Sequence, residues 1–167
     1  MAALVAAIAL RPYARPRGGR EGEVVPDFEL QRVTGSALHT MTIDSPLQHR
    51  GKVLLLHFWA PSCLPCRAEL PIWADLARDG SQFTVLTVAG DEADDVVHYL
   101  NANHLALPTV WDESGVAHRA LGVWSIPRTF VVSRTGVIVR DLDGPQTREA
   151  LLEAVRVARQ KVSDIDI

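Results

Sequence analysis

The chain has 167 residues and a net charge of −3, and this length suits one compact domain with a modest extension. Apolar residues make up 47% of the chain and charged residues 22%, the balance of an ordinary soluble globular protein. This charge balance gives no indication of a nucleic-acid partner. No stretch of the sequence is as long and apolar as a transmembrane helix.

The chain has only 2 cysteines, Cys63 and Cys66, which lie close together in the sequence. A structural disulfide stabilises a fold by closing a long loop, which this pair cannot do. A zinc site made of four thiolates would need two further cysteines. The spacing therefore predicts a chemical role for the pair.

The N-terminal part begins with an apolar run, Ala2 to Leu10, too short to span a bilayer but suited to a signal peptide or an anchor remnant. Arginines follow this run instead of preceding it, which by the positive-inside rule would place the rest of the chain in the cytoplasm. Either a charged segment precedes Met1 in the natural protein, or the run is a disordered arm. We expect residues 1–23 to be this apolar run and a flexible linker, and residues 24–163 to be the folded domain.

Strand and helix patterns alternate past the linker. Val25–Leu30 and Leu38–Ile43 are expected to be two short strands that form an N-terminal hairpin. Val53–Trp59 and Phe83–Ala89 are nearly continuous apolar runs, as in strands buried on both faces of a sheet. Between these two runs the pattern becomes helical, with apolar side chains at three- and four-residue spacing: Leu70, Trp73, Leu76 and Ala77.

Asp91 and the acids behind it are expected to open a second helix. We interpret this acidic cluster as capping rather than metal binding, because negative charge stabilises a helix N-terminus. Thr109–Trp111 is predicted to be a short strand. A brief helix should then run from a cap at Ser114 to Gly122.

The C-terminal part predicts a hairpin and a helix. Thr129–Ser133 and Val137–Asp141 form the hairpin, with its turn at Thr135-Gly136. The last helix is expected over about Thr147–Lys161. Together the elements predict an α/β fold: a central mixed sheet with helices on both faces, an N-terminal hairpin and a central insertion.

The segment Cys63-Leu64-Pro65-Cys66 follows a buried strand and precedes a helix. Free N–H groups and the helix dipole stabilise a thiolate at the first position. The second cysteine lies one turn inside the helix, close enough to resolve a mixed disulfide. Pro65 fits the first turn, where its missing N–H would be unpaired in any case. This setting predicts a redox-active dithiol.

Each alternative use of the two cysteines lacks residues that it requires. Covalent haem attachment needs a histidine directly after the second cysteine, where this chain has Arg67. Zinc would have to recruit two of 6 scattered histidines. A thiol peroxidase usually has a threonine three residues before its reactive cysteine, and this chain has Ala60 there. Peroxidase activity remains the less favoured alternative, beside a module that binds copper or a metallochaperone through the two thiolates.

Three segments together resemble the TlpA/ResA/DsbE-like branch of thioredoxins. They are Val25-Pro26-Asp27-Phe28-Glu29-Leu30, the run from His57 to Pro71 with the cysteine pair, and Ser125-Ile126-Pro127-Arg128-Thr129-Phe130. The His-Phe-Trp-Ala run also resembles copper-sensitivity-suppressor (ScsD-like) members, more weakly. The resemblance implies a thioredoxin-like fold and disulfide exchange with exported proteins, mostly as a reductase. It also implies an extracytoplasmic location, a membrane-bound electron donor or acceptor, and a possible N-terminal membrane tether.

Roles for individual residues follow from the resemblance alone. Cys63 would be the attacking cysteine and Cys66 the resolving one. Glu69 matches a carboxylate proposed to exchange protons with the cysteines, although an acid in a first helical turn also simply stabilises the helix. Pro127 matches a cis-proline that exposes the backbone of Ile126 to a substrate strand. Neither a cofactor nor a metal is implied.

The chain departs from the family pattern at three positions. Ser62 replaces the usual tryptophan before the first cysteine, which removes part of a flat docking surface. Arg128 replaces a threonine and could favour the Cys63 thiolate, favour an acidic partner or point into water. His57 replaces a buried Asp or an uncharged polar residue, and is either a satisfied core residue or a proton relay for Cys66. The residues expected to contact substrate are Ser62, Leu64, Pro65, Ile126 and Arg128.

Overall fold

Seven strands of the described residues form one mixed sheet in the order β2-β1-β5-β4-β3-β6-β7. The computed structural model describes residues 19–34, 37–80 and 82–160. The strands are β1 (Leu30–Thr34), β2 (Ala37–Asp44), β3 (Val53–Trp59), β4 (Phe83–Ala89), β5 (Thr109–Trp111), β6 (Arg128–Val132) and β7 (Ile138–Asp143). The helices are α1 (Leu64–Asp79), α2 (Ala93–Ala102), α3 (Val116–Leu121) and α4 (Arg148–Gln160), with a short 3₁₀ helix η1 (Pro46–His49).

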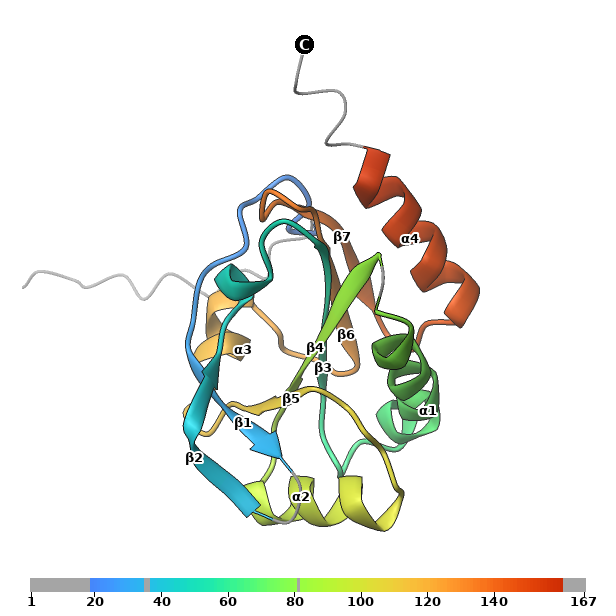
Figure 1. The fold of residues 1–167 in the computed structure, drawn as a ribbon. Helices are drawn as coiled ribbons and strands as arrows, with labels where there is room; N and C mark the ends of the chain where they lie inside the picture. Colours follow the sequence, from blue (N-terminus) through green and yellow to red (C-terminus); the bar gives the residue numbers. More distant parts are fainter. Residues whose placement is uncertain (1–18, 35–36, 81, 161–167) are drawn as a thin grey trace, which may run out of the picture.

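Strand β3 is the centre of the fold. It pairs in parallel with β4 and antiparallel with β6, and all of its residues are buried. Figure 1 shows α1 and α4 on one side of the sheet and α3 on the other. Successive side chains of β3 point to opposite faces. Leu55 and Trp59 therefore enter the core under α1, α2 and α4, while Leu54, Leu56 and Phe58 enter the core under α3.

The central insertion consists of α2 and β5. Strand β5 pairs in parallel with β4 and antiparallel with β1, so it joins the N-terminal hairpin to the rest of the sheet. The hairpin of β6 and β7 turns at Gly136, whose positive φ of 87° suits glycine. The predicted fold class, a mixed sheet with helices on both faces, an N-terminal hairpin and a central insertion, is confirmed.

Two of the sequence predictions about local structure are wrong. The first strand begins at Leu30 instead of covering Val25–Leu30, because the preceding segment bends away after a single bridge between Val24 and Val137. Ser114 does not cap α3. Instead, the backbone N–H of His118, in the first turn of α3, donates to the carboxylate of Asp112 at 3.0 Å. The residue that precedes the helix is Gly115.

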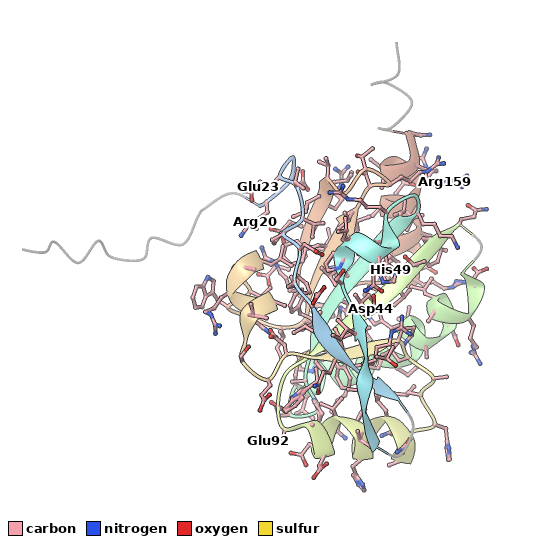
Figure 2. The ribbon with its side chains drawn as sticks, turned by 60° about the vertical axis from the view of Figure 1, so that its left-hand side comes forward. Arg20, Glu23, Asp44, His49, Glu92 and Arg159 are labelled. Atoms are coloured by element: carbon pink, nitrogen blue, oxygen red, sulfur yellow. A yellow bond between two sulfur atoms is a disulfide. The ribbon has the colours of Figure 1, made fainter. Side chains whose placement is uncertain are left out.

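The described part of the N-terminal segment lies along β7. The N–H of Gly22 donates to Ile138 O, and the N–H of Arg20 donates to the Asp141 carboxylate. Arg20 also forms an ion pair with Glu23, and Figure 2 shows these two side chains close together. Most of the predicted apolar run and linker, residues 1–18, lies outside the described residues. The domain boundary at residue 23 stays a prediction.

The end of α3 depends on Gly122, which has a φ of 64°. A Cβ at this position would make only ordinary van der Waals contacts, so the left-handed backbone conformation is what disfavours a side chain here. We expect Gly122→Ala to lower the free energy of unfolding by about 1 kcal/mol. Gly90→Ala, after β4, is the control, because the φ of Gly90 is not in the left-handed region and a Cβ there would meet atoms only at 4.0 Å. It should change stability by less than about 0.5 kcal/mol. Urea denaturation measures both variants, and equal losses would contradict the assignment.

Candidate redox site

Cys63 and Cys66 form a disulfide, with 2.04 Å between their sulfur atoms, so the structure is that of the oxidised protein. Helix α1 begins at Leu64, and Cys63 is the residue that caps it. The backbone N–H of Cys66 donates to Cys63 Sγ at 3.2 Å. The first sulfur therefore lies where the helix end favours negative charge, as the sequence predicts.

The two sulfurs differ in exposure. Cys63 is half-buried, whereas Cys66 is 0% exposed. Leu64, between them, is 71% exposed, and Ser62 and Pro65 are also exposed. A partner protein can therefore reach Cys63 but not Cys66.

The loop between β3 and α1 is fastened at two points. The N–H of Cys63 donates to Ala60 O at 3.1 Å, and the N–H of Ser62 donates to the Asp91 carboxylate at 2.9 Å. As predicted, the acidic cluster opens α2, because the helix begins at Ala93 and has Asp94 and Asp95 in its first turn. Asp91 itself lies before the helix and accepts a hydrogen bond from the cysteine loop instead. Asp91 follows β4, whose carboxyl end adjoins that of β3. Parallel pairing of the two buried strands is the signal that could have revealed this contact.

The loop before β6 faces the cysteine pair. The Ile126–Pro127 peptide bond is cis, as the family resemblance implies. Cys63 Sγ lies 3.8 Å from the carbonyl oxygen of Ile126, which is half-buried. The backbone that was expected to receive a substrate strand is thus next to the accessible sulfur.

Arg128 is held by two carboxylates. Its Nε donates to Asp141 Oδ1 at 2.6 Å, and its Nη1 lies 3.4 Å from Asp143 Oδ1. The hydrogen bond that Arg128 donates to Asp141 raises the pKa of Arg128 above its usual value. Arg128 therefore does not simply point into water. An effect of its charge on the Cys63 thiolate stays a prediction. Contact between Arg128 and a substrate stays a prediction.

His57 and Glu69 meet in the core behind the cysteine pair. His57 is 0% exposed and Glu69 is 4% exposed, and 3.3 Å separates His57 Nε2 from Glu69 Oε1. On its other side, His57 Nδ1 lies 3.0 Å from Thr129 Oγ1. The second carboxylate oxygen, Glu69 Oε2, accepts the N–H of Gln146 at 2.8 Å. The two residues that the sequence offered as separate proton acceptors are therefore neighbours.

Trp73 covers this pair from α1. Its ring stacks on His57, with 4.2 Å between the ring centroids and 20° between the planes. The sequence indicated Trp73 only as an apolar residue of the helix face. Its place on the same helix face as Cys66 and Glu69 was the available signal.

Burial dominates the ionisation of both groups. It raises the pKa of Glu69 to about 7, against the opposing effects of the Gln146 N–H and the Trp73 indole. It lowers the pKa of His57 to about 3, so the imidazole is neutral at physiological pH. A carboxyl group that titrates near neutrality can both release and accept a proton there.

Within the described residues, no three His, Cys, Asp or Glu side chains are grouped as a metal site would require. Copper binding would have to rest on the two sulfur atoms of Cys63 and Cys66 after reduction.

Glu69 and His57 should make the free energy of unfolding depend on pH in opposite directions. The folded chain keeps Glu69 protonated up to about pH 7 while the unfolded chain releases that proton near 4.5, so this contribution is lost as pH rises. The folded chain keeps His57 neutral down to about pH 3 while the unfolded chain protonates it near 6.5, so this contribution is lost as pH falls.

We therefore expect Glu69→Gln to make stability rise more steeply with pH than in the wild type over the window from 4.5 to about 7. Urea denaturation of the oxidised protein across this window measures the slope. Glu149→Gln, at an exposed position of α4, is the control and should retain the wild-type slope. The same slope in both variants would contradict a raised pKa at Glu69.

Comparisons with known proteins agree with this site. The family model described as AhpC/TSA family matches residues 22–140. The chain is 28% identical over 156 residues to sporulation thiol-disulfide oxidoreductase A of Bacillus subtilis, and the match covers 90% of each protein. It is 28% identical over 142 residues to the thiol-disulfide oxidoreductase ResA of Geobacillus thermodenitrificans, which covers 81% of this chain and 78% of ResA.

The fold is similar to the crystal structure of a putative thiol:disulfide interchange protein DsbE from Chlorobium tepidum. The TM-score is 0.74 at 25% identity, over 84% of this chain and 99% of that one. With a disulfide at the start of α1, these likenesses identify the activity as thiol–disulfide exchange. The chain belongs to the AhpC/TSA family and, within it, to the TlpA/ResA/DsbE-like thiol–disulfide oxidoreductases.

Proposed function

We propose that this protein reduces or exchanges disulfides of exported proteins through a mixed disulfide at Cys63, and that it acts mainly as a reductase. One observation carries the proposal: Cys63 is half-buried at the start of α1 beside exposed Leu64, while Cys66 is fully buried behind it. This difference in access separates an attacking sulfur from a resolving one.

The reaction begins with the reduced protein. The Cys63 thiolate, favoured by the end of α1, attacks one sulfur of the partner disulfide, and the other partner sulfur leaves as a thiolate. Cys66 then loses its proton and attacks Cys63 Sγ. This second step releases the remaining partner sulfur and re-forms the Cys63–Cys66 bond, so two electrons pass to the partner.

Glu69 is the proposed acceptor of the Cys66 proton. It lies three residues after Cys66 on α1, a spacing that places both side chains on one face of the helix. Burial disfavours a thiolate at Cys66, so the resolving step needs a base close by. A carboxyl group whose pKa is about 7 is half ionised near neutral pH and suits this task.

The substrate would lie across the loop before β6. The carbonyl of Ile126, 3.8 Å from Cys63 Sγ, is placed to accept an N–H from an extended partner segment. Exposed Leu64 offers an apolar contact, and exposed Ser62 offers a small polar one. Arg128, paired with Asp141 and Asp143, borders the same loop.

We place the protein outside the cytoplasm, in line with the family, where exported proteins carry disulfides. A membrane-bound electron donor and an N-terminal tether through residues 2–10 belong to the same proposal. None of the helices among the described residues has the length and apolarity to cross a membrane.

Cys63→Ser should abolish exchange, whereas Cys66→Ser should trap partners as mixed disulfides. The reason is position: a partner attached to Cys63 can be released only by the buried sulfur behind it. Non-reducing gels with a disulfide-bonded model protein measure the trapped species. Trapping by Cys63→Ser and none by Cys66→Ser would reverse the two roles.

The direction and the alternatives can be separated with the purified protein. A reductase should catalyse the reduction of insulin disulfides and have a reduction potential closer to about −270 mV than to about −120 mV. Anaerobic copper titration of the reduced protein tests the copper-binding alternative. Peroxide consumption tests the thiol peroxidase, which Ala60 disfavours. Tight copper binding without insulin reduction would overturn the proposed function.

A further inference from the structure

We propose that His57 is a positioning residue that keeps Glu69 hydrogen-bonded in both of its protonation states, through the single ring atom Nε2. This inference rests on the proposed role of Glu69 as the proton acceptor of Cys66. It goes beyond that role because it assigns His57 no titration of its own.

The first support is geometric. His57 Nε2 and Glu69 Oε1 are 3.3 Å apart, and both atoms lack an aligned hydrogen-bond partner among the described residues. The other polar atom of each side chain is engaged elsewhere: His57 Nδ1 with Thr129, and Glu69 Oε2 with the N–H of Gln146. His57 Nε2 therefore has Glu69 Oε1 as its available partner, and a small adjustment aligns them. The indole N–H of Trp73, which also lacks an aligned partner, is a second donor close to Glu69.

The second support is the chemistry of a neutral imidazole. One of its nitrogens donates and the other accepts, and the hydroxyl of Thr129 can serve either Nδ1 state because it donates as well as accepts. With the ring proton on Nε2, Thr129 donates to Nδ1, and Nε2–H donates to Glu69 Oε1 when Glu69 is ionised. When Glu69 is protonated on Oε2, its Oε1 is a carbonyl oxygen, and the same Nε2–H donates to it.

The proton count of the resolving step stays balanced in this scheme. The proton leaves Cys66, and Glu69 accepts it. His57 keeps its proton on Nε2 and carries no net charge before or after the step. Sulfur chemistry follows as described above, with Cys66 attacking Cys63 Sγ.

Two side chains near Glu69 can donate a hydrogen bond to it, His57 and Trp73. The groups that face it are His57 from β3, the Gln146 N–H from the loop before α4, and Trp73 with Cys66 from its own helix. No charged side chain of the described residues contributes to the pKa of Glu69. A hydrogen bond to a carboxylate is stronger than one to a neutral carboxyl group, so His57 favours the ionised form. Without Nε2, the pKa of Glu69 should rise.

Two variants distinguish the contribution of the Nε2 atom of His57 from that of its ring. His57→Phe retains a ring that can stack on Trp73 but has no nitrogen, whereas His57→Gln carries an amide that reaches the place of Nε2 but has no ring. Infrared titration of the carboxyl group in the oxidised full chain, assigned by its loss in Glu69→Gln, gives the pKa of Glu69. Stopped-flow measurement of the resolving step across pH 5 to 9 gives the kinetic midpoint.

We expect His57→Phe to raise both midpoints by about one pH unit and to slow the resolving step about tenfold near pH 6. His57→Gln should restore both midpoints to within about 0.3 unit of the wild type. His49→Asn is the control, because His49 bonds to Asp44 and Thr84 away from this pair, as Figure 2 shows for Asp44 and His49. It should shift neither midpoint.

The opposite pattern, wild-type midpoints in His57→Phe and shifted ones in His57→Gln, would mean that the ring only fills space and would overturn the inference. Equal shifts in both variants would overturn it as well. If His57→Phe does not fold, His57→Leu replaces it, since leucine also lacks a nitrogen. A resolving step that Glu69→Gln leaves unchanged would overturn the proton role of Glu69 itself, whereas a response to Glu69→Gln but not to His57→Phe rejects only the role of His57.

Discussion

The site depends on one arrangement: the N-terminus of α1 is fixed directly at the carboxyl end of the central, fully buried strand β3. Burial on both faces leaves that strand no freedom to shift, so the cysteine loop starts from a rigid point. The neighbouring strands then bring two further groups to the same end of the sheet. Asp91 follows β4 and holds the loop, while Ile126 precedes β6 and faces Cys63. Reactivity at an exposed sulfur is thus built on the least exposed part of the sheet.

The same strand introduces a polar group where apolar ones are usual. His57 lies between Leu56 and Phe58, but its side chain points to the opposite face, under α1. A buried imidazole and a buried carboxyl group are costly to desolvate unless each is satisfied. Their mutual contact and the stacking on Trp73 reduce this cost without neutralising it, and the residual effect is the raised pKa of Glu69. The core therefore has a titration that a purely apolar core would lack.

The sequence was sufficient for elements whose pattern is local. Periodicity and turn residues located β3, α1, β4 and the β6–β7 hairpin, because strand burial, helix amphipathicity and turns leave marks on neighbouring residues. The sequence did not predict contacts between residues that lie far apart in the chain. Asp91 resembles a helix cap until the pairing of β3 with β4 places it beside Ser62, and Arg128 appears free until β7 supplies Asp141. The proximity of His57 and Glu69 likewise follows from how α1 packs on β3, which no local pattern encodes.

The charges around Cys63 are in line with the proposed reductase direction. Dithiols become strong oxidants when their reduced form is highly stabilised, and nearby cations and helix N-termini both favour the thiolate. The guanidinium of Arg128 is committed to Asp141 and Asp143, and that of Arg67 lies over the Tyr99 ring, 5.2 Å from its centroid. The carboxylate of Asp91 adds negative charge at the adjoining residue, Ser62, and opposes a thiolate. The Cys63 thiolate is then stabilised mainly by the end of α1, which is a moderate influence. A dithiol whose thiolate is only moderately stabilised is a better electron donor than one whose thiolate is strongly stabilised.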